Sequence, residues 1–372
     1  MLHATQLVQR KKMKKIKEEH LPPFSCTHSP NFPALLSQLG CTLMVSTYQA
    51  GKLIFVSATN QQQLIQLPRT FKRAMGVALQ GDKMAVATAN EIITFVNSPQ
   101  LAATYPSKPQ TYDALYVPRA TYYTGHLDMH DLHYGKDALW GVNTSFSCLC
   151  QLDADYSFRP VWQPHFITEL ASEDRCHLNG LAMQDGEPLY VSALGTGNTH
   201  QSWRENITGG GVVIHIPSNE IVAHGLAMPH APRMYDGKLY VLMSAKEQLI
   251  CIDPDTGKHE VVATVPGFVR GMAKHGDYLF IGTSKLRKKS STFQHLKIAE
   301  KADAAGVTVV QLSTGKIVAQ LQWLASVDEI YDVQVLPNAS RPNIINTYGE
   351  NHNYALMLPK ATYWARPSDR KL

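Results

Sequence analysis

The sequence lacks a segment that could cross a membrane. No run of 18 apolar residues is present, and the N-terminus has no apolar core of the kind found in secretory signal peptides. Charged residues make up only 17% of the 372 residues, against roughly 25% in an average soluble domain. We therefore expect a soluble cytoplasmic protein with many buried strands and no membrane span.

The sequence also lacks a basic stripe along its body. The net charge of +5 comes mostly from one cluster of basic residues between Arg10 and Lys17, so a specific nucleic-acid partner is not expected. We interpret residues 1–24 as a basic disordered arm, residues 25–360 as a single domain and residues 361–372 as a C-terminal tail.

Several cofactor and metal motifs are missing. The six cysteines show no Cys-x-x-Cys pair of a zinc ribbon, and reduced, mostly buried thiols are expected. No P-loop, dinucleotide fingerprint, EF-hand loop or His-Glu-x-x-His helix occurs. These absences exclude the common nucleotide and zinc-protease classes and leave the function to be sought elsewhere.

What the chain does contain is a repeat. Copies of one frame begin at Met75, His130, Asn179, His230 and Arg270. Each copy is a short strand, a Gly/Asp turn that suits a tight hairpin, and an apolar strand. A second hairpin follows in several copies, which makes four strands per unit, as in the blade of a β-propeller.

The number of blades depends on the ends of the chain. A divergent copy near Asp332 and an earlier one at Met44 would give seven blades, the count we favour; six result if residues 42–68 instead supply outer strands to the last blade. The Gly-His and Trp-Asp signatures of the WD type are absent. We expect an all-β propeller with four-stranded antiparallel blades, closed by residues 25–45 lying beside 343–358.

Equivalent positions in a closed ring are related by rotation, so the first residues of the repeats should face one axis. These lead residues are Met75, His130, Asn179, His230, Arg270 and Asp332, to which the seven-blade count adds Met44. Further polar residues lie just before three of them: His126, Asp128, His177 and Glu329. Such groups are costly to bury without partners, metal or water.

The ring supports two functional hypotheses. In the first, a divalent transition metal is held by some of His126, His130, His177 and His230, with Asp128 and Asn179 completing the ring. Glu329 or Asp332 would then transfer a proton and Arg233 or Arg270 would clamp a carboxylate or phosphate, giving an enzyme that acts on a small molecule or peptide.

In the second hypothesis the propeller is a non-catalytic scaffold. It would bind a ligand or partner protein through Trp203, Arg204 and the insertion at 285–305, and the polar channel would be structural and filled with water. The sequence does not decide between these hypotheses or name a substrate.

Six segments carry a family resemblance: Thr47-Tyr-Gln-Ala-Gly-Lys-Leu, Asp128-Met-His-Asp-Leu-His, Asn143-Thr-Ser-Phe-Ser-Cys-Leu, Arg175-Cys-His-Leu-Asn-Gly-Leu-Ala, Pro229-His-Ala-Pro-Arg and Asp328-Glu-Ile-Tyr-Asp-Val-Gln-Val-Leu-Pro. On these motifs the chain resembles an uncharacterised family of bacterial conserved hypothetical proteins from about residue 25 to 358. More distantly the design is similar to six-bladed calcium-dependent lactonases, whose metal is held by Glu, Asn and Asp. This ring has histidines where that pattern has oxygens, so the second resemblance implies only the fold.

Overall fold

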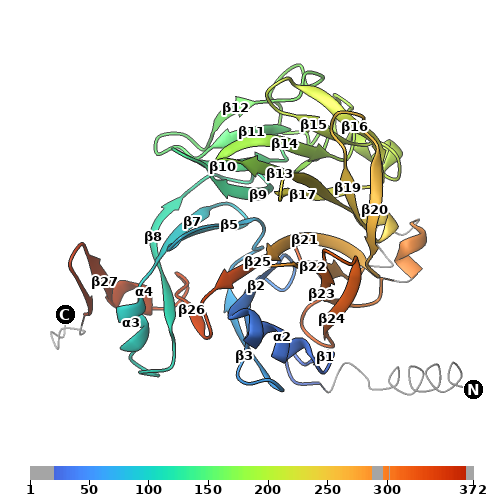
Figure 1. The fold of residues 1–372 in the computed structure, drawn as a ribbon. Helices are drawn as coiled ribbons and strands as arrows, with labels where there is room; N and C mark the ends of the chain where they lie inside the picture. Colours follow the sequence, from blue (N-terminus) through green and yellow to red (C-terminus); the bar gives the residue numbers. More distant parts are fainter. Residues whose placement is uncertain (1–20, 287–295, 301, 366–372) are drawn as a thin grey trace, which may run out of the picture.

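The computed structural model describes residues 21–365 apart from 287–295 and 301. Most of the predicted basic arm and the end of the predicted tail therefore lie outside the described residues. Within them the chain forms a ring of antiparallel sheets, the predicted β-propeller (Figure 1).

Six blades make up the described ring, each with four strands counted outward from the channel. The innermost strands are β5 (Val77–Gln80), β9 (Met129–Tyr134), β13 (Leu178–Gln184), β17 (Pro229–Tyr235), β21 (Phe268–His275) and β25 (Asp332–Pro337). The second strands are β6 (Lys83–Ala87), β10 (Leu139–Asn143), β14 (Glu187–Ala193), β18 (Lys238–Met243), β22 (Tyr278–Ser284) and β2 (Cys41–Thr47). The third strands are β7 (Ile92–Asn97), β11 (Cys148–Gln151), β15 (Gly211–His215), β19 (Gln248–Ile252), β23 (Ala305–Gln311) and β3 (Lys52–Ala58). The outer strands are β8 (Ala114–Tyr122), β12 (Arg159–Trp162), β16 (Glu220–Leu226), β20 (His259–Thr264), β24 (Lys316–Trp323) and β4 (Leu64–Thr70).

The turn residues that predicted the repeat do form its tight turns. Asp185 and Gly186 both have positive φ (51° and 76°), as do Asp236 and Gly237 (52° and 73°). Two successive left-handed residues are the requirement of a type I′ hairpin, whose twist matches that of the flanking strands. In these two blades the turns fix the register between the innermost and second strands, and so the positions of Asn179 and His230.

The blade count corrects the prediction of seven. Met44, read as the start of an additional blade, lies on β2 and pairs with Gln334 of β25, so residues 41–70 provide the outer strands of the last blade. Figure 1 shows β2, in blue, beside β25, in red. The prediction that residues 25–45 lie beside residues 343–358 was also wrong. β2 pairs with residues 332–337 instead, because the last blade takes its innermost strand from that part of the chain.

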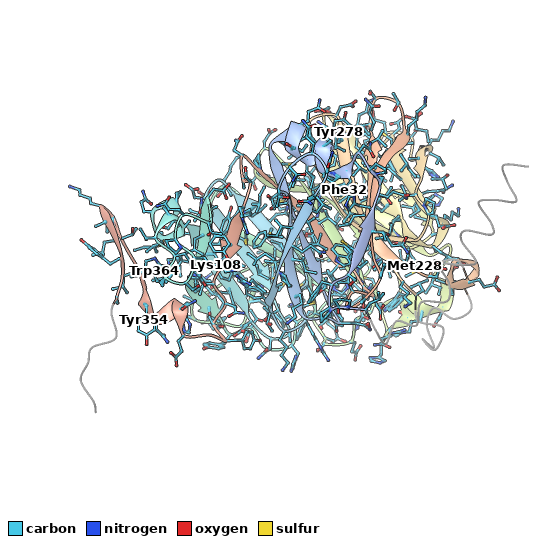
Figure 2. All side chains as sticks on the ribbon, turned by 90° about the horizontal axis from the view of Figure 1, so that it is seen from below. Phe32, Lys108, Met228, Tyr278, Tyr354 and Trp364 are labelled. Atoms are coloured by element: carbon cyan, nitrogen blue, oxygen red, sulfur yellow. The ribbon has the colours of Figure 1, made fainter. Side chains whose placement is uncertain are left out.

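The hydrophobic core is divided among the blade interfaces. One buried cluster lies between each pair of neighbouring blades, and the cluster between β2–β3 and β22–β24 also takes in Phe32 of α2 (Phe32–Leu39). Figure 2 shows Phe32 near Tyr278, which packs against the same cluster. Burial on both faces explains why the strands read as nearly continuous apolar runs.

Additional elements line the rim. β1 (Cys26–His28) extends one blade beyond β24, and β26 (Pro342–Ile344) pairs in parallel with β8. A hairpin of β27 (Ala355–Leu358) and β28 (Ala361–Trp364) follows α4 (Asn351–Tyr354), and its Trp364 packs with α3 (Pro99–Ala103). Residues 361–364, expected in a tail, thus form a strand; Figure 2 shows Tyr354 and Trp364 at the projecting end of the molecule. No described helix is long and apolar enough to span a bilayer.

Candidate functional site

A cavity of about 630 Å³ lies at one mouth of the channel. It gathers the predicted residues Asp128, His130, His177, His230, Arg270 and Glu329. Its remaining walls include apolar and aromatic side chains, among them Tyr48, Leu194, Trp203, Met228, Phe268, Leu286 and Tyr331. We call this space the upper cavity.

The backbone before the lead residues has one conformation in four blades. The residue two positions earlier is left-handed in each: Arg73, Asp128, His177 and Met228, with φ between 52° and 57°. This conformation costs a side-chain-bearing residue about 1 kcal/mol or more. Two of these strained residues, Asp128 and His177, place charged or titratable groups in the upper cavity, as strained residues often do at functional sites.

Three histidines of successive blades share one hydrogen-bonding pattern. The Nδ1 atom of His130 lies 2.9 Å from the carbonyl oxygen of Asp128, and that of His230 lies 3.0 Å from the carbonyl oxygen of Met228. A carbonyl only accepts, so each Nδ1 carries the proton and each Nε2 keeps its lone pair. His177 holds its Nδ1 2.9 Å from a carboxylate oxygen of Asp174. Each ring is thus fixed through Nδ1, which leaves Nε2 for a ligand.

Burial keeps two of these imidazoles neutral. It lowers the pKa of His130 to about 4, with Asp128 acting in the opposite direction, and holds the pKa of His230 well below its ordinary value. The nearby Arg270 lowers both pKa values further. At neutral pH both side chains are hydrogen-bond acceptors toward the cavity.

Asp174 connects His177 to the cavity wall. Its second oxygen accepts a hydrogen bond of 2.9 Å from Trp203 Nε1, and the Trp203 ring lies against the imidazole with centroids 4.4 Å apart. Trp203 is only 4% exposed, so it forms the wall and does not project toward a partner protein. His177 is also held edge-on against His130, with centroids 4.8 Å apart.

Arg270 and Glu329 form the opposite wall. Arg270 Nη1 lies 3.2 Å from Glu329 Oε1, and the guanidinium lies 3.8 Å from the centre of the Tyr331 ring. A guanidinium over an aromatic face is held by cation–π attraction. The ion pair balances the charge of this wall.

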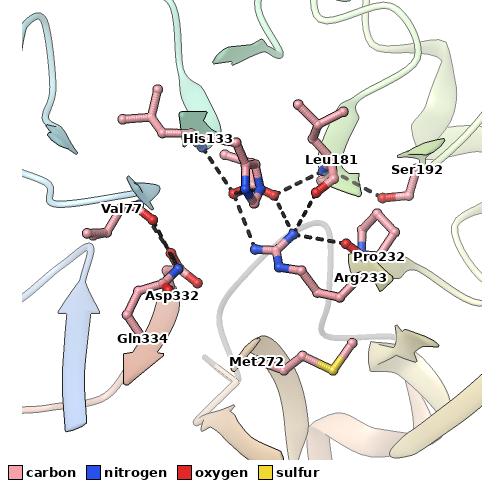
Figure 3. Close-up of polar contacts among 12 residues, drawn as sticks. Val77, His133, Leu181, Ser192, Pro232, Arg233, Met272, Asp332 and Gln334 are labelled. Atoms are coloured by element: carbon pink, nitrogen blue, oxygen red, sulfur yellow. Dashed lines mark hydrogen bonds and ion pairs between the residues drawn. The ribbon is translucent and has the colours of Figure 1, made fainter. Parts of the chain in front are cut away.

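Arg233 and Asp332, predicted to act with these residues, lie deeper in the channel. Arg233 Nη1 donates to Asp131 Oδ2 at 2.8 Å and to the carbonyl oxygen of Leu181 at 2.8 Å (Figure 3). The short ion pair crosses from one innermost strand to another. Although burial acts to raise it, the pKa of Asp131 is held below its ordinary value by Arg233 and His133. Arg233 is therefore committed to Asp131 and is not free to clamp a ligand at the upper mouth.

Asp332 is likewise occupied by the protein. Its Oδ2 accepts from the Val77 amide at 3.1 Å and from Gln334 Nε2 at 3.0 Å (Figure 3). Burial, aided by the negative charge of Asp131, raises its pKa to about 6. It lies in the channel below the upper cavity.

The remaining predicted residues are separated from the cavity walls. His126 places Nδ1 3.1 Å from the carbonyl oxygen of Ala89 and does not line the upper cavity, so the four histidines do not converge. Asn179 lies beneath the upper cavity, where it lines a small space of about 20 Å³. Among the described residues no group of three or more His, Cys, Asp or Glu side chains is placed to hold a metal ion.

A second cavity, of about 340 Å³, opens on the other side of the Arg233–Asp131 pair. Arg233 lines this lower cavity together with Tyr235, Lys274 and Gln334. The channel is therefore closed in the middle by a buried ion pair, with one cavity at each mouth.

Sequence reasoning missed Asp174 and Tyr331, and it assigned Trp203 to a surface for a ligand or partner protein instead of to the cavity wall. Asp174 and Trp203 lie in excursions from the repeat, where no periodicity points to them. Tyr331 lies next to a residue that was singled out, and only its contacts reveal its role.

Comparison with known proteins supports the fold. A search of curated proteins finds no match. Among solved structures, a chain of the crystal structure of a nidogen/laminin complex matches 80% of this chain and 99% of its own length, with a TM-score of 0.51 and 11% identity. At that identity the likeness extends to the fold alone. A family model described as "Domain of unknown function (DUF4915)" matches residues 30–345. The match includes all six blades, and the chain belongs to the DUF4915 family.

Proposed function

We propose that the upper cavity binds a small organic molecule and that His177, oriented by Asp174, acts on it as a general base. The observation that carries the proposal is the common arrangement of His130, His177 and His230. Each is fixed through Nδ1 beside the same cavity and retains Nε2 for a ligand or a proton.

The His177–Asp174 contact has the geometry of a catalytic base and its orienting carboxylate. A carboxylate that accepts from Nδ1 fixes the tautomer and stabilises the imidazolium that forms when Nε2 takes a proton. His130 and His230, being neutral, add acceptors without adding charge. The set can therefore remove a proton from water or a ligand hydroxyl.

The cavity suits a small molecule in size and lining. Its volume of about 630 Å³ falls within the 300–1,000 Å³ of typical ligand sites. Trp203, Phe268 and Leu194 offer apolar surface to the body of the ligand, while the histidines and the Arg270–Glu329 pair fix its polar groups. This combination of apolar walls and few convergent polar groups characterises binding sites for organic ligands.

The test is hydrolysis of a panel of p-nitrophenyl esters, amino-acid p-nitroanilides and p-nitrophenyl phosphate. We expect turnover of at least one compound, with kcat reduced by roughly 10²–10⁴-fold in His177→Gln. His215→Gln, at a partly exposed histidine on β15 that does not line the upper cavity, is the matched control and should keep the wild-type rate. Absence of turnover, or equal rates in wild type and His177→Gln, would contradict the catalytic role and leave a binding scaffold.

The same three histidines favour a second candidate, a bound divalent transition metal. Metal-ligating histidines characteristically donate their other ring N–H to a carbonyl or carboxylate, as these do. The rings would have to draw together, since the described side chains form no ligand group as they stand. Protein purified without a histidine tag, incubated with Zn²⁺ or Mn²⁺ and dialysed, should retain one ion per chain, and His130→Asn/His230→Asn should retain none. Equal retention by both proteins, or none by wild type, would exclude this candidate.

A further inference from the structure

The floor of the upper cavity contains two donor groups without a protein acceptor. Tyr331 OH and Asn179 Nδ2 are buried and make no hydrogen bond within the described residues. The two residues are only 6% and 4% exposed. An unpaired buried donor costs about 1–3 kcal/mol, so native proteins rarely keep two together without use.

Both donors border one small space next to the upper cavity. The small space of about 20 Å³ is lined by both residues and shares His130, His230, Arg270 and Tyr331 with the upper cavity. It therefore lies directly beneath the upper cavity. Its volume is enough for an atom or two of a ligand entering from above.

The charges around the cavity floor favour a neutral ligand oxygen over a carboxylate as the acceptor for these two donors. Asp131 and Asp332 carry two buried carboxylates there, and the single Arg233 forms an ion pair with Asp131. Arg270, the other cation at this level, is paired with Glu329. A ligand carboxylate would add a further negative charge to a region that already has no excess of positive charge, whereas a neutral carbonyl oxygen would not.

We propose that Tyr331 OH and Asn179 Nδ2 receive the carbonyl oxygen of an uncharged ligand such as an amide, ester or ketone. The inference rests on the proposed function and names the ligand class of the same cavity. The neutral Nε2 atoms of His130 and His230 would then accept any N–H or O–H that the ligand carries. The apolar walls would enclose its hydrocarbon part.

A donor kept for a ligand should be dispensable for the free protein. Tyr331→Phe removes a hydroxyl that makes no protein hydrogen bond, so its Tm should equal or exceed that of the wild type. The matched control is Tyr235→Phe, whose hydroxyl lies 3.4 Å from the Met272 carbonyl oxygen and lines the lower cavity.

The experiment compares four probes that share one apolar body: phenylacetamide, phenylacetone, phenylacetate and 2-phenylethylamine. Binding is followed by isothermal titration calorimetry and by NMR of ¹³Cε1-labelled histidine, which reports occupancy beside the imidazoles. We expect the amide and the ketone to bind more tightly than the carboxylate and the amine. Tyr331→Phe and Asn179→Leu should each weaken the two carbonyl probes about three- to tenfold, and Tyr235→Phe should leave them unchanged.

The outcomes separate the two proposals. If phenylacetate or the amine binds at least as tightly as the carbonyl probes, with histidine shifts, the carbonyl inference fails while the cavity remains a ligand site. Unchanged carbonyl affinity in both Tyr331→Phe and Asn179→Leu also overturns the inference. If no probe binds or shifts a histidine resonance at millimolar concentration, the proposed function fails with it.

Discussion

Asp131 and Asp332 make the same set of backbone contacts in two different blades. In each, Oδ1 accepts from the amide of the next residue, and Oδ2 accepts from an amide of the neighbouring innermost strand, Leu181 or Val77. The two aspartates therefore occupy equivalent positions of the repeat. Each joins its own blade to the next one at the channel, where the sheets come closest.

The differences between the two aspartates set the charge of the channel. Asp131 has the Arg233 side chain as its partner and is held ionised, whereas the side chain that donates to Asp332 is the neutral Gln334, and the pKa of Asp332 is raised. One cation thus serves two buried carboxylates. The Arg233–Asp131 pair is the contact on which the closed middle of the channel depends.

Arg233→Met should destabilise the protein by about 3–5 kcal/mol, because it leaves the Asp131 carboxylate buried without its counter-charge. The change is measured as the shift in urea midpoint or Tm. Asp131→Asn/Arg233→Met should recover part of the loss, since neither charge then remains. The surface pair Lys136–Glu187, more than half exposed on both sides, is the control; Lys136→Met should cost less than about 1 kcal/mol. Equal effects of the two single changes would contradict the role of burial.

The positions of the lead residues could be predicted from sequence because the Gly/Asp turns fix the register of each blade. Met75, His130, Asn179, His230 and Arg270 all lie within two residues of the start of an innermost strand. Only the sixth lead was shifted: the equivalence of Asp131 and Asp332 makes Tyr331 the counterpart of His130. No Gly/Asp turn follows Asp332 in the sequence, so nothing in the sequence fixes the register of the blade that contains β25.

The chemistry of the site was predictable in part. Glu329 and Asp128 were found because they precede lead residues, and both line the cavity. Asp174 was not found, because it reaches His177 from a loop, and sequence periodicity cannot predict the path of a loop. Nor could sequence show that Arg233 is neutralised by Asp131, since that ion pair joins residues 102 positions apart.

Close approach of the innermost strands requires glycine at position 76. A Cβ built on Gly76 would lie 2.8 Å from the Cα of Asp131, in backbone of the neighbouring blade that cannot move aside. Gly76→Ala should therefore destabilise by about 1–3 kcal/mol through overpacking. Gly81→Ala is the control: its φ of 55° is strained for alanine, but no atom lies within 4 Å, so about 1 kcal/mol is expected. A smaller loss for Gly76→Ala than for Gly81→Ala, measured by urea unfolding, would refute the close contact.

Acid should destabilise the protein through its buried histidines. An unfolded histidine takes up a proton near pH 6.5, whereas folded His130 does so only near pH 4. Between these values the unfolded state binds more protons, so the free energy of unfolding falls as the pH is lowered. Asp332 opposes this over part of the range, because its pKa of about 6 lets the folded state bind a proton first.

Comparison with His130→Gln separates the two contributions. From pH 7 to pH 4.5, wild-type Tm should fall a few degrees more than that of the variant, since glutamine does not titrate. Asp332→Asn should show the reverse, with a steeper loss of Tm on acidification than the wild type. Parallel Tm curves for wild type and His130→Gln would contradict a neutral, buried His130.

Two truncations should test how the ring closes. Ending the chain after residue 345 removes the β27–β28 hairpin and α4 but keeps every blade, and it matches the end of the family model. This protein should fold, with a modest loss of Tm from uncovering α3. Ending the chain after residue 331 removes β25, the innermost strand of the blade formed by β2, β3 and β4. The unpaired edge of β2 would then be exposed along the channel, and aggregation is expected. Size-exclusion chromatography and circular dichroism distinguish the two results. A monomeric, folded 331-residue protein would show that the ring does not depend on the pairing of β2 with β25.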